Sequence, residues 1–305
     1  MKIYIAPIAG VTDYSYRKIL KSYEPDMMFT EMISSNAIVM GNEKTKIEML
    51  KLLPGDAVQL FGKDIKIMLE SAKYIQSLGV KHIDINAGCP VRKVVKNGYG
   101  SALLNDPKHL EELLKTLKDN LDMDLSLKIR IGYGKYKEPI KIAKIAEKLN
   151  LKFLTVHGRT KEQMYSGTAN WEVIKQIKEE VSIPIIGNGD IFTAEDAYNK
   201  VKESNVDGIM LARGIFGNPW LIRQIKEKFE LGEVKTIVTD RDKIEMIKKH
   251  FKIALEDKGK RAIVEMRKHI CWYIKGMKNS SKIKNEINKL EKLEDIERLL
   301  DTLII

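Results

Sequence analysis

The sequence contains little cysteine and no long apolar segment. Only two of its 305 residues are cysteines, Cys89 and Cys271, and neither belongs to a CxxC pair. The five histidines show no paired ligand spacing, so we expect no metal site. The opening stretch MKIYIAPIAG lacks the pattern of a secretory signal peptide, and no apolar run approaches 18 residues. We therefore expect free thiols, no membrane association and a cytoplasmic location.

Acidic residues are also in the minority. The chain has 53 Lys and Arg against 42 Asp and Glu, a formal net charge of +11. Such an excess suits a polyanionic partner, although a lysine-rich composition alone can produce it. The charge is concentrated between Asp240 and Lys284, where 14 basic residues against 6 acidic ones give +8, whereas residues 285–305 carry a net −3. This concentration favours a polyanionic partner for the segment.

The chain contains eight short apolar runs, each followed by a helical pattern. They are IYIAP (3–7), MMFTEM (27–32), AVQLF (57–61), HIDIN (82–86), LSLKIR (125–130), FLTVHG (153–158), PIIGNGD (184–190) and GIMLAR (208–213). Strands that alternate with helices indicate βαβ units and a parallel sheet. An open doubly wound sheet is the alternative, but no GxGxxG follows the first run. We predict an α/β fold: a (β/α)8 TIM barrel over residues 1–235, followed by a small all-α C-terminal domain over residues 240–305.

A barrel carries its chemistry at the C-terminal ends of its strands, and polar residues gather at those ends here. Two glycine-bearing stretches, GNGD (187–190) and LARGIFGNP (211–219), follow the seventh and eighth predicted strands. Many barrels bind a phosphate at these two loops. Flavin mononucleotide (FMN) fits best, because Lys128 and His157 protrude from the intervening strands where a flavin ring could accept hydrogen bonds. A phosphorylated substrate without any cofactor is the alternative.

Several motifs together resemble one known family. They are IAPIAGVTDYSYR (5–17), VQLFG (58–62), IDINAGCPVRKVVKNGYGSALL (83–104), LKIRIG (127–132), VHGRT (156–160), IGNGDI (186–191), MLARGIFGNPW (210–220) and EMRKHICWYIKG (265–276). The order GCP, HGRT, NGDI, RKH resembles the tRNA-dihydrouridine synthases over nearly the whole chain. The resemblance implies an oxidoreductase that uses FMN, reduced by NADPH, to reduce the C5=C6 bond of selected uridines in tRNA.

The resemblance also implies roles for individual residues. By its match to the GCP motif, Cys89 is the acid that protonates C5 after hydride reaches C6 from the flavin. A thiol with an ordinary pKa near 8.5 is mostly protonated at neutral pH, as a proton donor must be. Cys271, inside a helical pattern, is expected to be a small apolar packing residue. The expected cofactor contacts are Pro7, Ile8, Ala9, Gln59, Lys128, His157, Asn188, Gly189, Asp190, Ala212 and Arg213.

Several substrate contacts are expected close to the cysteine. Asn86 matches a residue that hydrogen-bonds the uracil, and Arg130 is a further candidate. Lys93 and Lys96, in the loop after the cysteine, are expected to touch RNA. The sequence departs from the family pattern at Ile8, where Met is common, at Ala212, where Gly is common, and in NAG before the cysteine. These departures remove no reacting group.

The segment from Lys260 to Lys278 has the pattern of an amphipathic helix. Ile263, Met266, Ile270, Tyr273 and Met277 share one face, and Lys260, Arg267, Lys268, Lys275 and Lys278 share the other. We expect the basic face, Arg267 and Lys268 above all, to contact tRNA phosphates. No obligatory protein partner is expected. Two other functions remain open: a flavin barrel that acts on a free pyrimidine, such as a dihydroorotate dehydrogenase, and an RNA-binding protein that has lost catalysis.

Overall fold

The computed structural model describes residues 1–43, 45–135 and 137–303, so residues 304 and 305 of the expected helical domain lie outside the described residues. Within these ranges one sheet contains nine parallel strands. They are β1 (Lys2–Ile5), β2 (Met27–Phe29), β3 (Ile33–Ser34), β4 (Asp56–Phe61), β5 (His82–Ala87), β6 (Asp124–Gly132), β7 (Leu154–Thr160), β8 (Ile185–Asn188) and β9 (Gly208–Leu211).

The sheet closes into a barrel. Its strand order is β2-β1-β9-β8-β7-β6-β5-β4-β3, and β2 also pairs with β4. The pairing Met28↔Asp56 supplies the closing contact, and the two-residue strand β3 pairs further along β4, at Ile33↔Leu60. The predicted eight-stranded barrel is confirmed, and β3 is an additional short strand that the sequence pattern does not separate from the run before it.

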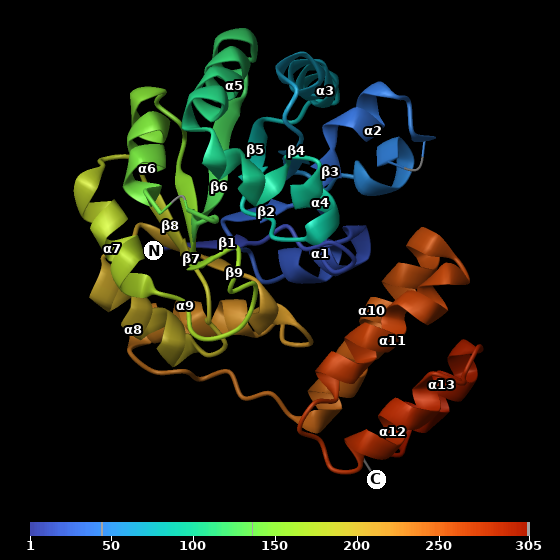
Figure 1. Ribbon diagram of the computed structural model, residues 1–305. Helices are drawn as coiled ribbons and strands as arrows, with labels where there is room; N and C mark the ends of the chain where they lie inside the picture. The colour runs from blue at the N-terminus through green and yellow to red at the C-terminus, as the bar shows by residue number, and fades with distance from the viewer. Residues whose placement is uncertain (44, 136, 304–305) are drawn as a thin grey trace.

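Helices surround the barrel on the outside (Figure 1). The helices as far as the end of the barrel are α1 (Tyr14–Lys21), α2 (Ser35–Val39), α3 (Ile65–Ser77), α4 (Arg92–Lys96), α5 (Pro107–Asn120), α6 (Pro139–Lys148), α7 (Trp171–Glu180), α8 (Ala194–Ser204) and α9 (Leu221–Leu231). Shorter turns are the π-helical η1 (Thr45–Met49) and the 3-10 helices η2 (Gly100–Asn105) and η3 (Arg213–Ile215).

The helix starts follow local chemistry. Asp13 caps α1 by accepting the Tyr16 N–H, and Asp64 caps α3 in the same way. Thr193 and Asp196 form a reciprocal capping box at the start of α8. Each cap satisfies backbone donors that the first helical turn leaves without a partner. The starts of α1, α3 and α8 are therefore encoded by single side chains next to the apolar pattern of each helix.

Two apolar layers hold the barrel together. The larger lies between the strands and the surrounding helices and includes Ile83, Ile85 and Val58. The smaller lies inside the barrel and contains Phe29, Phe153, Ile186 and Met210 among others. Because side chains alternate along a strand, the residues between the outward-facing isoleucines of β5 point into the barrel.

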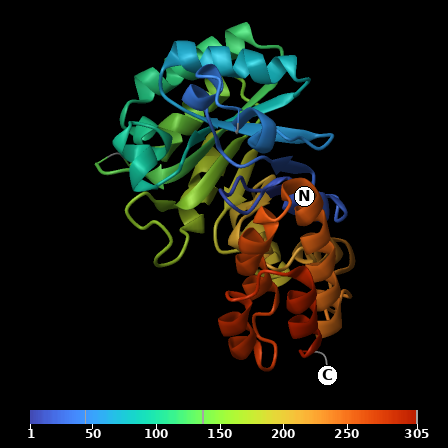
Figure 2. The same cartoon turned by 90° about the vertical axis from the view of Figure 1, so that its right-hand side faces the viewer.

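As far as residue 303, where the description ends, four further helices follow the barrel: α10 (Asp240–Lys258), α11 (Arg261–Tyr273), α12 (Ser280–Ile287) and α13 (Leu293–Asp301). They form a bundle to one side of the barrel (Figures 1 and 2). The buried Tyr16 of α1 stacks on His250 of α10 with ring centroids 5.0 Å apart. No helix of the described residues has both the length and the apolar character that a membrane span needs.

The amphipathic segment differs from its prediction at one end. Helix α11 ends at Tyr273, so Lys275, Met277 and Lys278 lie in the turns that follow it. Met266, Ile270 and Tyr273 are buried as expected, and Met277 is buried in the turn. Gly276, with φ of +87°, lies in this turn and adopts a left-handed conformation that favours glycine.

Candidate active site

The strand register brings the predicted polar residues together at the C-terminal end of the barrel. Asn86 of β5 is paired with Lys128 of β6, and His157 of β7 is paired with Asn188 of β8. Gln59 of β4 is paired with Asp84 of β5, two residues before Asn86. The Lys128 Nζ lies 3.3 Å from Asn188 Oδ1, and the Asn188 side-chain amide donates to the Met210 carbonyl at 2.7 Å.

Burial determines the charges in this ring. Burial, reinforced by the nearby Arg130 charge, lowers the pKa of Lys128 to about 8. Burial and the surrounding cations also hold the pKa of His157 far below its usual range, so its ring is neutral at physiological pH. The ring therefore offers amide groups, one neutral imidazole and one cation to whatever binds at this end of the barrel.

Cys89 lies in the loop after β5 and is held on both sides. Its N–H donates to Asn86 Oδ1 at 2.9 Å, and its carbonyl accepts from the Ser101 N–H at 3.1 Å and the Ser101 hydroxyl at 2.9 Å. A Cβ at Gly100, where φ is +60°, would lie 2.8 Å from the Cys89 carbonyl oxygen, so only glycine fits there. Burial raises the pKa of the Cys89 thiol, which favours the protonated form.

Arg130 links the cysteine loop to the loop after β7. Its Nε donates to the Gly88 carbonyl at 2.9 Å, and its Nη1 donates to the carbonyls of Thr160 and Met164 at 2.8 and 2.9 Å. The residue is only 3% exposed. These contacts are those of a side chain that holds two loops together.

The loops after β8 and β9 approach each other closely. A Cβ at Gly214 would lie 2.1 Å from the Ile191 carbonyl oxygen, so a larger residue would push the two loops apart. A pocket beside them is lined by His157, Tyr165, Asn188, Gly189, Asp190, Ile191, Phe192, Met210, Ala212, Arg213 and Gly214. Five of the predicted cofactor contacts, from the ends of β8 and β9, thus share one pocket with His157 of β7.

Asp190 orients the arginine of this pocket. Its carboxylate accepts from Arg213 Nη2 at 3.1 Å and from both Nη atoms of the buried Arg159 at 2.9 and 2.8 Å. The Arg213 guanidinium also lies 5.2 Å from the centre of the Tyr165 ring. Against the effect of burial, the Arg159 hydrogen bond lowers the pKa of Asp190, so the carboxylate stays ionised.

The remaining barrel residues lie at the same end. Pro7, Ile8 and Ala9 form the turn that follows β1, where the Ile8 N–H donates to the Thr12 hydroxyl at 2.8 Å. Lys93 and Lys96 were expected in a loop but are exposed on the short helix α4, directly after the cysteine loop. They therefore stand at the surface next to Cys89.

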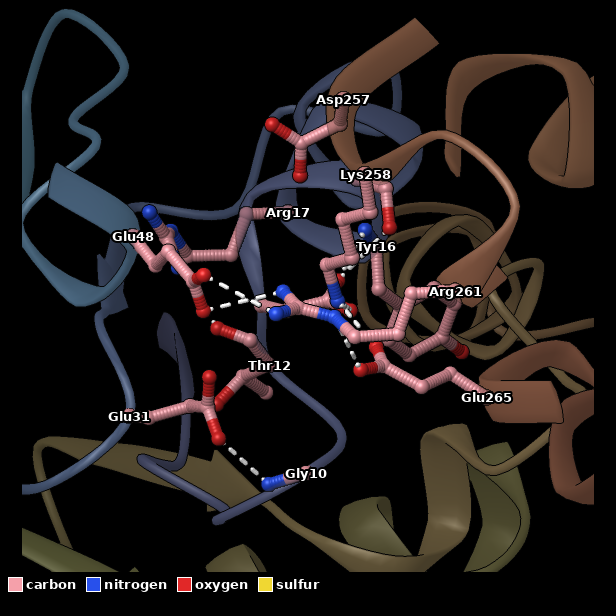
Figure 3. Close-up of polar contacts among 12 residues, drawn as sticks. Gly10, Thr12, Tyr16, Arg17, Glu31, Glu48, Asp257, Lys258, Arg261 and Glu265 are labelled. Carbon is pink, nitrogen blue, oxygen red and sulfur yellow. Dashed lines mark hydrogen bonds and ion pairs between the residues drawn. The ribbon is translucent and has the colours of Figure 1, made fainter. Parts of the chain in front are cut away.

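A cavity of about 740 Å³ separates this end of the barrel from α10 and α11. Ion pairs bridge it. Lys258 contacts Asp13, and Arg261 donates to both carboxylate oxygens of Glu48 at 2.9 Å. On the helical side, Glu265 of α11 lies 2.6 Å from the same Lys258. Figure 3 shows Arg261 reaching across to Glu48, with Glu31 turned toward the N–H of Gly10.

The two basic residues predicted to bind phosphates are placed differently. Lys268 lines the cavity, and its Nζ lies 3.4 Å from the position of a Cβ at Gly10. Arg267 instead donates to the Leu290 carbonyl at 3.0 Å, within the helical bundle. Lys268 is thus directed toward the barrel, whereas Arg267 contacts the segment between α12 and α13.

Comparison with known proteins agrees with this arrangement. The model of the family described as dihydrouridine synthase (Dus) matches residues 4–304. The chain belongs to the dihydrouridine synthase family. A Rickettsia bellii protein named "Probable tRNA-dihydrouridine synthase" is 36% identical over 293 residues, which cover 94% of this chain and 89% of that protein. The tRNA-dihydrouridine synthase B of Pasteurella multocida is 36% identical over 296 residues, with 95% and 88% covered. The predicted family membership is confirmed.

Solved structures share the fold of this dihydrouridine synthase family member. Histamine dehydrogenase from Rhizobium sp. 4-9 superimposes with a TM-score of 0.55 at 15% identity, over 83% of this chain but 49% of that larger protein. A variant of NCR from Zymomonas mobilis superimposes with a TM-score of 0.52 at 16% identity, over 79% and 90%. These similarities support the barrel fold.

The sequence prediction missed some residues that shape the site. Asp84 is fully buried below Asn86. Because it lies two residues before Asn86 on the same strand, the sequence could have indicated that both side chains point to the same face. Ser101 and Gly100 hold the cysteine loop, and the YGS sequence at 99–101 gave no sign of this contact. Tyr165 lies in a polar loop, where residue spacing does not predict which side chains meet. Its contact with Arg213 is therefore visible only in the folded structure.

Proposed function

We propose that this chain reduces the C5=C6 bond of uridines in tRNA to 5,6-dihydrouridine, with FMN as cofactor and NADPH as reductant. A flavin cofactor is consistent with its membership in the dihydrouridine synthase family. The placement of Cys89 carries the proposal, because a protonated thiol stands at the C-terminal end of the barrel in a loop that hydrogen bonds hold from both sides.

The residues at this end of the barrel fit FMN. The Arg213 guanidinium and the closely spaced glycine-bearing loops after β8 and β9 suit an anionic phosphate. The Lys128 cation and the Asn188 amide beside it suit the hydrogen-bonding edge of a flavin ring. We assign the cofactor contacts to Pro7, Ile8, Ala9, Gln59, Lys128, His157, Asn188, Gly189, Asp190, Ala212 and Arg213.

When bound, reduced FMN supplies the hydride that C6 of the uracil requires. The chain's own contribution is a proton, which the Cys89 thiol delivers to C5. A raised thiol pKa keeps that proton in place until negative charge develops on the base. Asn86 keeps the thiol in register through its hydrogen bonds to the loop, and Arg130 ties the same loop to the one after β7.

We further propose a division of labour along the chain. Residues 1–235 would form the catalytic part and residues 240–305 the part that binds tRNA. The local charge of +8 between Asp240 and Lys284 and the position of Lys268 at the cavity support this division. Lys93 and Lys96, exposed beside the cysteine loop, would meet the same RNA. A tRNA substrate would place the enzyme in the cytoplasm.

The test is a direct assay of the product. Purified protein should be yellow with flavin absorbance, and with NADPH it should form dihydrouridine in tRNA that was transcribed without modifications. Cys89→Ala should retain flavin and its reduction by NADPH yet form dihydrouridine about 10² to 10⁴ times more slowly, the usual cost of losing a general acid. Cys271→Ala, on α11, serves as the matched control with normal turnover.

Three outcomes would contradict the proposal or a part of it. A colourless protein that binds tRNA would favour a binding protein without catalysis. A yellow protein that reduces or oxidises free pyrimidines but not tRNA would favour another class of flavin barrel. Wild-type turnover in Cys89→Ala would reject the role of that thiol.

A further inference from the structure

A buried carboxylate inside the barrel accepts hydrogen bonds from two directions. Asp84 of β5 has no exposed surface, and its Oδ2 accepts from Gln59 Nε2 at 2.6 Å. Its Oδ1 accepts from the Ser126 hydroxyl, whose oxygen lies 2.8 Å from His82 Nε2. Two branches of hydrogen bonds therefore end on the same side chain.

The Gln59 branch leads to the cysteine loop. Gln59 Oε1 accepts from Asn86 Nδ2 at 2.7 Å. Asn86 Oδ1 in turn accepts from the backbone N–H groups of Cys89 at 2.9 Å and Gly88 at 3.2 Å. The chain of contacts from Asp84 to the thiol loop thus contains two side-chain amides and no gap.

The two ends of this branch fix the direction of every bond in it. An ionised carboxylate can only accept, so Gln59 must turn its NH2 group toward Asp84. A backbone N–H can only donate, so Asn86 must turn its oxygen toward Cys89. With both ends satisfied, Gln59 Oε1 meets Asn86 Nδ2, an acceptor meeting a donor. A flip of either amide would oppose two like groups between buried side chains, since Gln59 is 0% and Asn86 is 6% exposed.

The charge state of Asp84 agrees with this direction. Burial raises the pKa of its carboxyl to about 6, while the hydrogen bonds from Ser126 and Gln59 and the charge of Lys128 oppose the rise. The group is therefore an acceptor at neutral pH. His82, on the other branch, is neutral because burial lowers its pKa to about 4.

We propose that Asp84 is a positioning residue for Cys89: it sets the orientation of the Gln59 and Asn86 amides, and through them it holds the backbone of the loop that carries the thiol. This inference rests on the proposed function, in which that thiol is the proton donor. Asp84 itself touches neither the thiol nor the rim of the barrel.

Amide hydrogen exchange in the flavin-free protein tests the structural step without an activity assay. Asp84→Asn keeps the shape of the side chain but can offer NH2 to Gln59, which removes the fixed direction. Exchange at Gly88 and Cys89, followed by mass spectrometry of peptides that span them, should speed up about fivefold, the change that corresponds to about 1 kcal/mol. Ser126→Ala is the matched control, because it removes a buried hydrogen bond to Asp84 on the branch that does not reach Cys89.

A double variant provides a rescue. In Asp84→Asn with Asn86→Asp, the carboxylate moves to the other end of the branch. It can still accept from both backbone N–H groups, and Gln59 can turn to donate to it while accepting from the amide introduced at position 84. Exchange at Gly88 and Cys89 should return toward the wild-type rate, although Asn86→Asp alone should speed it. The double variant also tests the proposal if Asp84→Asn alone does not fold, because its exchange can be compared with that of Asn86→Asp.

The catalytic step is tested separately in the flavin-loaded enzyme. Asp84→Asn should slow dihydrouridine formation about fivefold or more, and by a larger factor than it slows reduction by NADPH without tRNA, because Gln59 is also assigned to the cofactor. Unchanged exchange, or an equal rise in Ser126→Ala, would overturn the positioning role. Faster exchange with unchanged turnover would also overturn it. If the proposed function is wrong, Cys89→Ala will show full turnover, but exchange at Gly88 and Cys89 will still be faster in Asp84→Asn.

Discussion

Arg159 of β7 donates hydrogen bonds from both Nη atoms to the carboxylate of Asp190, at 2.9 and 2.8 Å, and the arginine is only 1% exposed. Asp190 follows β8 and has a φ of +50°, so this pair holds an unusual backbone conformation as well as two charges. The same carboxylate contacts Arg213. The buried arginine thus neutralises the acid that orients the arginine proposed to bind phosphate.

Removing the buried arginine should be costly. Arg159→Met removes the buried ion-pair partner of Asp190, whose side chain is only 20% exposed. Breaking such a pair typically costs about 3 kcal/mol or more of unfolding free energy. Urea denaturation would measure it. Arg298→Met is the matched control, because Arg298 and its partner Asp295 have side chains 79% and 39% exposed, and its effect should stay below about 1 kcal/mol. Similar small effects in both variants would mean that the Arg159 pair does not stabilise the barrel.

Arg213 should matter for the cofactor and little for the fold. Arg213→Ala removes a charge-assisted contact to the FMN phosphate, worth about 1.5 to 3 kcal/mol, so the dissociation constant for FMN should rise tenfold or more. Asp190 keeps Arg159 as its partner, so the unfolding free energy should change little. Fluorescence titration of the flavin-free protein with FMN provides the measurement. Arg223→Ala, an exposed arginine on α9, is the control, and an unchanged affinity in Arg213→Ala would place the phosphate elsewhere.

The pair between Asp13 and Lys258 should make stability depend on acid pH. Although burial acts in the opposite direction, the Lys258 charge and hydrogen bond lower the pKa of Asp13 from 3.8 to about 2. The stability from this ionised group is present in full above the unfolded-state pKa and is lost as pH falls through the folded-state pKa. The difference corresponds to about 2 kcal/mol.

Asp13→Asn isolates that effect, because asparagine can still cap α1 but carries no charge. The variant should be about 2 kcal/mol less stable than wild type at pH 7 and at pH 5, and the gap should narrow between about pH 4 and pH 2. Urea denaturation at four pH values would reveal this. A gap that is independent of pH would mean that the Lys258 charge does not stabilise the ionised acid.

The fold was predictable because its signals are local. Most strands are short apolar runs, and several helix starts, such as those of α1 and α8, have a side chain that caps them, Asp13 and Thr193 respectively. Strand β3 was missed because two residues carry no periodicity, and the end of α11 was missed because the amphipathic pattern continues through Gly276.

The site was predictable only as far as strand ends define it. Register places Asn86 beside Lys128, and counting residues from the strand ends gave the same grouping. Residue spacing does not predict the direction in which a long side chain points. Arg130 and Lys128 lie on the same strand face, yet the Arg130 donors bind loop carbonyls while the Lys128 amine lies near Asn188. Which partner a long side chain reaches depends on loops that adopt their conformation only in the folded chain.

The two basic residues of α11 should respond differently when tRNA binds. Lys268 faces the cavity, so Lys268→Ala should weaken tRNA binding and make the slope of log K against log[salt] shallower by roughly one, since one phosphate fewer releases its counterions. Arg267→Ala should mainly lower the unfolding free energy, by about 1 to 3 kcal/mol, because the arginine donates to the Leu290 carbonyl inside the bundle. Lys141→Ala, an exposed lysine on α6, is the control for charge alone. Salt titrations of tRNA binding, with reduction of the flavin by NADPH measured in parallel, would separate these effects. An equal change of slope in Lys141→Ala would mean that the cavity lysine contributes only to the overall charge.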